Sequence, residues 1–432
     1  MKTSYFFRSA IIIACIAFSS FAVNAQTIID GIAYTVIELN GANVAEVAPL
    51  DNNDTRYQQT SITIPSEVVI GGTTYPVKRI GDGSLREAPN LTTVVISEGV
   101  EIIGNSAFPQ CPVLETVTIP STVNSIEDWA FYGCPALSSI NIPEGITAIT
   151  EHTFQLTGLT SIVLPSSVTE LKTCAFQDAS KLASINLENI TRIGAWALYG
   201  TAITSVELPK PVIFAGGETF RNCKSLETVV INETMSTGSW TFTNCENLKS
   251  VVYKSELGAI DAGAFSGCLS LTSFIIPNTV VFIDDWAFEK SGITKMYASW
   301  ADPDGEVFIM DNAFGEEDGK INFTWNVPSN LISAYGSEWL GYPVEVGVPD
   351  GGDSSIRNNI AEKANVYYSN GNLNLLDMDG YNVSVIALDG RTVAGFRIDG
   401  ANSRIPVSLN AGVYLLNAEN GTSRATAKFV VR

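Results

Sequence analysis

The chain has 432 residues, of which 45% are hydrophobic, so it can bury a large core and is not disordered in bulk. Its formal net charge of −20 argues against binding to nucleic acid, which requires a basic face, and against docking on anionic lipid. A single histidine leaves little room for a serine–histidine–aspartate triad or a histidine metal site.

The first 25 residues have the form of a secretory leader. An apolar run over residues 9–18 follows Arg8 and is too short to span a bilayer, and residues 23–25 satisfy the rule for a cleavage site. We therefore expect cleavage after Ala25 and export. The alternative is lipidation at Cys15, which ends a stretch that resembles a lipobox but leaves a short apolar region.

No later stretch of the sequence is apolar for long enough to span a membrane. The sequence thus predicts an exported protein without a transmembrane segment, located at the cell surface, in the outer membrane layer or outside the cell. A periplasmic location is the alternative.

A tripeptide that ends in phenylalanine or leucine recurs along most of the chain. Its last residue returns at steps of 22 or 23 residues, and only the final step is 26 residues. The eleven positions are Leu85, Phe108, Phe131, Phe154, Phe176, Leu198, Phe220, Phe242, Phe265, Phe288 and Phe314. A unit of this length cannot bury its own apolar face, whereas stacked coils bury it between neighbours, so the repeat predicts a solenoid.

Each unit also contains a short strand pattern. Alternation at Val117 and Ile119 predicts a strand with one buried face, and Pro120 ends it because proline cannot donate to a ladder. The full pattern, L-x-x-[IV]-x-[IL]-P-x-x-[VI]-x-x-I-x-x-x-A-F-x-x-C, resembles the BspA-type leucine-rich repeat over about residues 80–345. This resemblance implies cell-surface adhesion or host-protein binding in a bacterium of the Bacteroidetes kind.

The C-terminal part has a different composition and period. Residues 341–360 are rich in Gly, Pro, Asp, Ser and Asn, which is typical of a linker, and the alternating segments beyond them predict a small β-sandwich. Residues 385–391, 409–414 and 428–432 resemble the C-terminal sorting domain of the Bacteroidetes type IX secretion system. The usual opening Tyr-Pro-Asn-Pro is replaced by residues 366–370, so a plain accessory β-domain is the alternative.

The sequence therefore predicts a mainly β protein in five segments. They are a signal peptide (1–25), an N-terminal β cap (26–80), a leucine-rich-repeat solenoid of about 11 coils (81–345), a linker (346–360) and a C-terminal β-sandwich (361–432).

Six cysteines follow the leader, and five share one phase of the repeat, three residues after its phenylalanine. The five are Cys111, Cys134, Cys223, Cys245 and Cys268, whereas Cys174 precedes its phenylalanine by two residues. The shared phase predicts buried thiols packed between coils, with a bridge between neighbours as the alternative. Metal-ligand spacings such as C-x-x-C are absent, and we predict no metal site and no cofactor.

The position two residues before the repeat phenylalanine carries several aromatic side chains. It holds Trp129, Trp196, Trp240 and Trp286, and His152 occupies it once. We expect the tryptophans to pack against the next coil, with ligand contact as the alternative, because tryptophan is common at binding hot spots. We expect the histidine to be a surface or edge residue without a partner.

Paired acids precede two of these tryptophans, at residues 127–128 and 284–285. Hydrolysis by two carboxylates needs side chains that face each other, whereas sequence neighbours on a turn diverge. The sequence offers no clustered acid, base or nucleophile, and we predict that the protein is not an enzyme.

The outward positions of the predicted strands form two rows. The hydroxyl row consists of Thr93, Thr116, Ser139, Ser161, Ser184, Ser205, Thr228, Ser250 and Ser273, and the outer row consists of Val95, Thr118, Asn141, Val163, Asn186, Glu207, Val230, Val252, Ile275 and Tyr297. We expect Val230, Val252, Ile275 and Tyr297, beside Thr228, Ser250 and Ser273, to form an exposed apolar strip that docks a partner. The alternative is a solvated sheet whose residues reflect β-propensity and cross-strand pairing.

These features together favour an exported binding or adhesion protein. Its repeat face would bind a host or bacterial surface protein or a glycan. The alternative is a structural or self-associating envelope scaffold without an external ligand.

Overall fold

The computed structural model describes the cap and the repeats almost continuously and the tail in short stretches. The described residues are 26–50, 56–208, 212–214, 216–231, 237–254, 257–316, 318–347, 365–369, 372–376, 380–387, 392–398, 402–407, 409, 412–419 and 424–431. The predicted leader and most of the predicted linker lie outside these residues.

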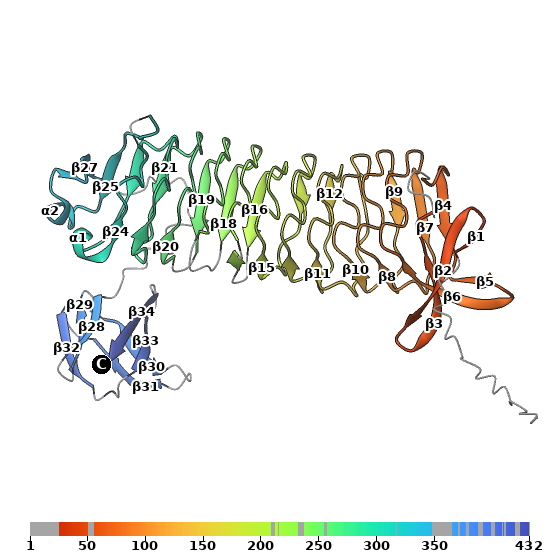
Figure 1. The fold of residues 1–432 in the computed structure, drawn as a ribbon. Coiled ribbons are helices and arrows are strands. Elements are labelled where there is room, and N and C mark those ends of the chain that lie inside the picture. The colour runs from red at the N-terminus through yellow and green to blue at the C-terminus, as the bar shows by residue number, and fades with distance from the viewer. Residues whose placement is uncertain are drawn as a thin grey trace, which may run out of the picture.

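The repeats form a β-solenoid of about 11 turns with almost no helix, as the sequence predicts. Successive coils stack side by side into a rod, and most coils contribute a strand to a first row of parallel strands (Figure 1). This row comprises β4 (Ser61–Ile64), β7 (Thr93–Ile96), β9 (Thr116–Thr118), β12 (Ser161–Ile162), β14 (Ser184–Ile185), β16 (Ser205–Leu208), β18 (Thr228–Ile231), β19 (Ser250–Tyr253), β21 (Ser273–Ile275), β23 (Lys295–Tyr297), β25 (Thr324–Val327) and β27 (Tyr342–Val346).

A second row of very short parallel strands runs along another side of the rod. It comprises β6 (Thr73–Ile80), β8 (Ile102–Ile103), β10 (Ser125–Ile126), β11 (Ala148–Ile149), β13 (Glu170–Leu171), β15 (Arg192–Ile193), β17 (Ile213–Phe214), β20 (Ala259–Ile260), β22 (Phe282–Ile283) and β24 (Phe308–Ile309).

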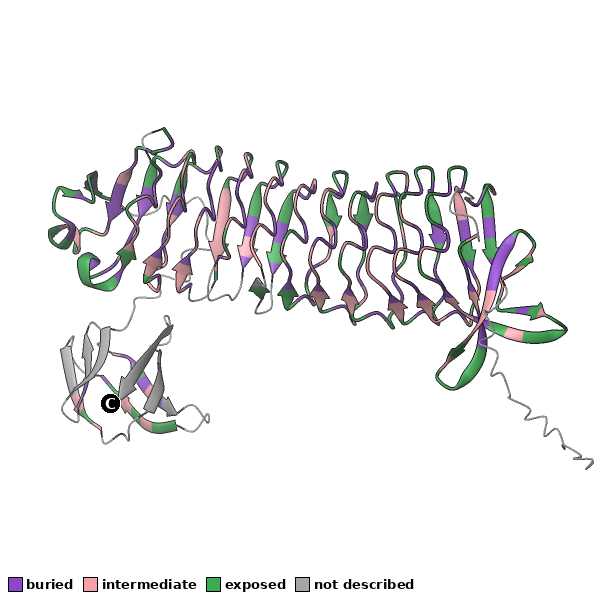
Figure 2. Ribbon diagram, in the orientation of Figure 1, coloured by how far each residue is buried: buried purple, intermediate pink, exposed green. Residues whose placement is uncertain are grey.

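The first row has one buried and one solvent-facing side because its strands alternate as a half-buried strand must. In β16, Val206 and Leu208 are buried while Ser205 and Glu207 are exposed. Buried and exposed segments alternate along the strands in the same way in Figure 2. The apolar residues of both rows thus meet in one continuous core inside the rod.

Phenylalanine rings form two stacked ladders at the centre of this core. Phe131 is fully buried, and its ring is nearly parallel to those of Phe108 and Phe154, with centroids 5.3 and 5.6 Å away. A second ladder runs from Phe220 to Phe314 with centroid separations of 5.5 to 6.1 Å. Each ring therefore loses its contact with water only because a neighbouring coil covers it, and dispersion adds to this burial.

The backbone beside each ring is left-handed at two positions, which the sequence analysis does not anticipate. The first of these positions lies two residues before the repeat phenylalanine, or before the leucine that replaces it, and we call it the left-handed row. It consists of Gly83, Ser106, Trp129, His152, Cys174, Trp196, Glu218, Trp240, Gly263 and Trp286. The companion row lies two residues after the ring and consists of Glu87, Gln110, Gly133, Leu156, Asp178, Gly200, Asn222, Asn244, Gly267 and Lys290. A side chain in this conformation costs roughly 1–2 kcal/mol relative to the right-handed region.

This backbone conformation directs hydrogen bonds along the rod in one sense. In each coil the N–H groups of the left-handed residue, of the ring residue and of the companion residue donate to carbonyls of the next coil at 2.6 to 3.2 Å. Phe131, for example, donates to Thr153 at 3.0 Å, while its predecessor Phe108 donates to Ala130. The main-chain bonds offset the conformational cost and fix the register of each coil on its neighbour.

The cysteines lie in the interior, in agreement with the predicted packing role. Five thiols lie 3.1 to 3.2 Å from the carbonyl oxygen of the ring or leucine residue one coil earlier, as Cys134 does with Phe108. Burial raises the pKa of the Cys223 thiol to about 11, so it is protonated at neutral pH and donates to Leu198. Cys174, which has the other phase, is also buried.

The N-terminal end of the rod is covered by hairpins. Strands β1 (Thr27–Ile29), β2 (Ile32–Leu39) and β3 (Ala42–Val47) form an antiparallel meander, and β5 (Glu67–Ile70) pairs with β6. Arg79 of β6 joins this cap to the first coils, because its guanidinium contacts Glu46 at 2.9 Å, Glu127 at 3.0 Å and Asp82. The cap thereby covers the open end of the apolar core.

The C-terminal end is closed by aromatic side chains. Two short helices, α1 (Pro303–Glu306) and α2 (Ile332–Tyr335), and strand β26 (Glu338–Trp339) surround the last coils. The Trp325 ring contacts Phe314, Phe323 and Trp339, and Trp339 Nε1 donates to Asp304 at 2.9 Å. These rings cover the last surface of the core.

The tail is a separate pair of antiparallel sheets. One sheet has the order β28-β29-β32 and the other β31-β30-β33-β34. Their bounds are β28 (Asn365–Ser369), β29 (Asn372–Leu376), β30 (Asn382–Ala387), β31 (Thr392–Arg397), β32 (Asn402–Pro406), β33 (Gly412–Glu419) and β34 (Arg424–Val431). Leu373, Val383, Val385 and Leu416 are buried, as the inward positions of a small sandwich are.

Candidate binding surfaces of the solenoid

The hydroxyl row faces outward along the first row of strands. Seven of its nine members are exposed and the other two, Thr93 and Ser250, are half-buried. The predicted binding residues Thr228 and Ser273 are among the exposed members. The hydroxyl groups are therefore available to a partner over most of the rod.

The apolar strip of the outer row is less exposed than the sequence predicts. Val230, Val252 and Ile275 are half-buried, and Tyr297 is buried with only 9% of its surface exposed, so its prediction as an exposed residue is wrong. Val230 pairs in register with Glu207 and Val252, and Ile275 pairs with Tyr297, so neighbours of the same row cover part of each side chain. By contrast, Val163 of the same row is 77% exposed.

The burial of Tyr297 follows from its place near the end of the rod. It pairs in register with Ile275 on one side and with Asn326, which is also buried, on the other. A Cβ on Gly347 would lie 2.5 Å from Asn326 Oδ1, so the chain that leaves β27 already occupies this end of the row. The usable strip is therefore Val230, Val252 and Ile275.

Asparagines interrupt the outer row in the N-terminal half of the rod. The Asn186 amide donates to the Leu164 carbonyl at 2.9 Å and accepts from the Leu164 N–H at 2.6 Å, and Asn141 forms the same pair of bonds with Ile119. These amides bind the preceding coil and are not free for a ligand. The two halves of the row thus differ chemically.

A polar rim borders the apolar strip. Glu227 and Lys249, each directly before a member of the hydroxyl row, form an ion pair of 3.0 Å between half-exposed side chains. Lys224 and Glu246 form another of 2.8 Å on the same two coils. An apolar centre with a polar rim of both charge signs is the usual anatomy of a protein–protein contact.

Aromatic side chains form a second surface on the left-handed row. The Trp129 ring stacks on the His152 ring of the next coil, with centroids 3.8 Å apart and planes 14° from parallel, and the Tyr132 ring meets it at 66°. Trp129, Tyr132 and His152 are all half-buried. The predicted packing against the next coil is therefore confirmed for Trp129, while the prediction that the histidine lacks a partner is wrong.

Two further tryptophans of this row reach each other across a glycine. A Cβ on Gly263 would lie 2.1 Å from Cε3 of Trp240, so the ring lies over this residue and stacks on Trp286 at 6.0 Å. Trp196 stands apart from these clusters and is 38% exposed. Gly83 and Gly263 occupy the same row as the four tryptophans. Glycine at this position of the repeat was the sequence signal for a left-handed backbone there.

The neighbouring acids are engaged in structural contacts. Glu127 accepts from Arg79 and from the Asn105 N–H, and Asp128 Oδ1 accepts from the Glu151 N–H at 3.0 Å. Asp284 accepts from the N–H of the next residue. Their contacts agree with the interpretation of a turn rather than of opposed catalytic carboxylates.

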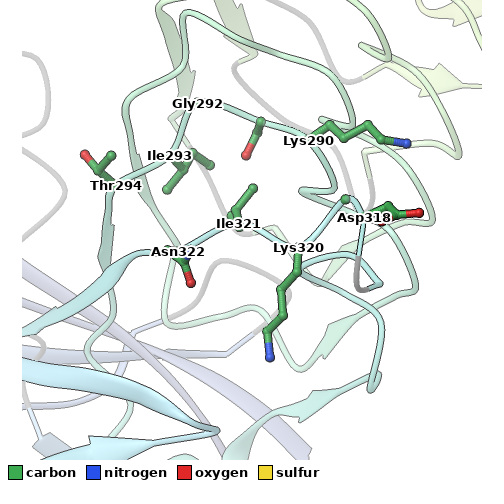
Figure 3. A pocket seen from close by; sticks show the side chains of 10 residues that line it. Lys290, Gly292, Ile293, Thr294, Asp318, Lys320, Ile321 and Asn322 are labelled. Carbon is green, nitrogen blue, oxygen red and sulfur yellow. The ribbon is translucent and has the colours of Figure 1, made fainter.

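A hollow of about 300 Å³ opens between two coils near the C-terminal end, where the repeat step is longest. Its lining includes Lys290, Gly292, Ile293, Lys320 and Ile321. The two lysine side chains point away from each other (Figure 3), one toward Glu289 at 3.0 Å and one over a tyrosine ring at 5.2 Å. Among the described lining residues, which also include Asp318, the two lysines do not converge on a common point.

Within the part of the chain that the structure describes, no group of three or more His, Cys, Asp or Glu side chains could hold a metal ion. In the same described ranges, no helix is long and apolar enough to cross a membrane.

The repeats match the sequence model of a known protein family. The model of the BspA type leucine rich repeat region matches residues 78–201 and 175–294 in six copies, so the chain belongs to the BspA-type leucine-rich-repeat family. No curated protein matches the chain.

Crystal structures of other bacterial repeat proteins are similar. A leucine-rich repeat protein from Bacteroides ovatus is 20% identical, with 74% of this chain and 100% of that chain covered and a TM-score of 0.36. A leucine rich cell surface protein from Faecalibacterium prausnitzii is 22% identical, with 72% and 97% covered and a TM-score of 0.37. The pneumococcal vaccine antigen PcpA is 15% identical, with 76% and 99% covered and a TM-score of 0.40.

The contact between Gly263 and Trp240 predicts a position-specific cost for alanine. Gly263→Ala should destabilise the rod by about 1–3 kcal/mol beyond the effect of Gly83→Ala, because its methyl group collides with the indole. Both glycines belong to the left-handed row, with φ of 61° and 60°, but nothing lies within 3.8 Å of the Cβ position at Gly83. Urea unfolding of both variants measures the difference, and equal losses would contradict the contact.

Proposed function

We propose that this protein is an exported surface protein that binds a macromolecular partner through the outward side of its first strand row. The observation that carries this proposal is the strip of Val230, Val252 and Ile275, bordered by the hydroxyl row and by ion pairs. A half-exposed apolar centre on a rigid sheet loses little entropy when it is covered, so its burial contributes to affinity.

The chemistry of the strip favours a protein over a glycan as its partner. The centre is aliphatic, its one aromatic member, Tyr297, is buried, and the rim carries charges of both signs. A protein surface can cover aliphatic groups and pair with the rim, whereas a glycan gains most from exposed aromatic faces. The same features also suit a second copy of the chain, and self-association is the second candidate.

We further propose that the segment 361–432 sorts the protein to the cell surface. The support is the sequence resemblance of its strands to the type IX sorting domain, together with the export signal expected over residues 1–25. The rod would then present the strip outside the cell.

Val252→Glu should abolish binding through the strip, because an unpaired carboxylate at its centre loses water without gaining a partner. We expect at least a tenfold weaker interaction, about 1.4 kcal/mol or more, of the labelled protein with intact cells or immobilised host surface proteins. The matched control is Val163→Glu, on the same row but outside the strip.

Analytical ultracentrifugation of the same variants separates the two candidates. A wild-type dimer that Val252→Glu dissociates would support self-association, whereas a monomer that loses only partner binding supports the external ligand. Unchanged association and unchanged binding in a folded Val252→Glu protein would contradict both.

The location has its own test. An antibody against the repeats should label intact source cells that express the full chain and should not label cells that express a chain without residues 361–432 at equal protein level. Label that is seen only after the cells are permeabilised, even with the full chain, would contradict surface display.

A further inference from the structure

The left-handed row carries side chains that its backbone does not favour. In the companion row, which has the same left-handed conformation, six of the ten members are glycine, asparagine or aspartate, which adopt it readily, and the other four are Glu87, Gln110, Leu156 and Lys290. The left-handed row instead holds four tryptophans and a histidine, although Gly83 and Gly263 prove that glycine fits there. The strain of these aromatic residues points to a benefit that comes from the side chain itself.

Trp129 stacks on a histidine and has a tyrosine beside it. Its ring is backed by His152 on the side of the next coil and forms a corner with Tyr132. In the opposite direction along the rod the same row holds Ser106 and then Gly83, neither of which has a large side chain. The aromatic corner is therefore a rigid platform with small neighbours on one side.

Hydrogen-bonding groups border this platform. Asn105, Asp128 and Glu151 directly precede the row on three consecutive coils, and Gln155 is bonded both to His152 Nδ1 at 2.6 Å and to Gln177 at 2.9 Å. The equivalent residues before Trp196, Trp240 and Trp286 are Ala195, Ser239 and Asp285. Trp286 therefore shares the preceding carboxylate, but the histidine stack and the tyrosine corner are found at Trp129.

We propose that the platform of Trp129, Tyr132 and His152 binds a neutral saccharide. The electron-rich face of an indole attracts the polarised C–H groups of a pyranose ring, and carboxylates such as those of Asp128 and Glu151 accept its hydroxyl protons in strong hydrogen bonds. The negative rim repels sulfated and acidic sugars. A basic peptide is less suited, because Trp129 and His152 lie parallel and only Tyr132 meets them at an angle, so the rings do not enclose a cation as an aromatic cage does.

This site is separate from the apolar strip of the proposed function. It lies on coils near the N-terminal end and on another row, whereas the strip lies on β18, β19 and β21. The two proposals therefore fail or succeed independently.

The test is calorimetric titration of the folded full-length mature chain with gluco-, manno-, xylo- and galacto-hexasaccharides, with a heparin hexasaccharide and with hexalysine. At least one neutral hexasaccharide should bind with a Kd below about 1 mM. Trp129→Gly should weaken this binding at least about tenfold. The variant should remain folded, because glycine adopts the φ of 62° without strain and this offsets part of the stability lost with the stack on His152.

Trp196→Gly is the matched control, because it removes a tryptophan of the same row with a φ of 54°. Ala195 directly precedes Trp196, and the next coil places Glu218, which is paired with Arg221, where Trp129 has His152. It should bind the saccharide like the wild type, as should Val252→Glu. The proposal is overturned if no neutral hexasaccharide binds, if only hexalysine or heparin binds, or if Trp129→Gly and Trp196→Gly have the same effect.

Discussion

Each coil of this protein is stable only when it lies against its neighbours. A unit of 22 or 23 residues has too few apolar side chains for a core of its own, and a ring inside a ladder, such as that of Phe131, is covered by the rings before and after it. Beside the rings, the left-handed segment of the main chain adds three hydrogen bonds per step with the N–H groups directed toward the C-terminal end. The hairpin cap and the aromatic closing unit follow from the same need, because a stack exposes apolar surface at both ends.

The stack also determines which positions are free to evolve a binding role. The inward side chains and the thiols are buried and pack in the core. The hydroxyl row, the outer row and the left-handed row recur once per coil along the rod. The outer row is used for structure where Asn141 and Asn186 bind the preceding coil, and it is apolar where Val230, Val252 and Ile275 follow one another. The fold thus leaves several distinct rows of side chains on the outside of the rod.

The sequence predicted the solenoid, its buried cysteines and its outward hydroxyl row, because each depends only on the repeat period. It did not predict the burial of Tyr297, since that depends on where the chain leaves the last strand and contacts Asn326. The stack of Trp129 on His152 was also missed, because the direction of a side chain on a left-handed residue is not a property of the period. The sequence did contain a clue to the left-handed backbone, because Gly83 and Gly263 share a row with the tryptophans. This clue becomes visible only when the repeats are aligned with one another.

The most direct test of coil-on-coil stabilisation compares two phenylalanines that differ in burial. Phe131 is fully buried between two rings, whereas Phe308 is 63% exposed although it stacks on Phe282 at 6.0 Å. Denaturant unfolding should give a loss of about 3–5 kcal/mol for Phe131→Ala and less than about 1 kcal/mol for Phe308→Ala. A loss below about 1 kcal/mol for Phe131→Ala, far under the usual cost of a buried ring, would contradict the stacked core.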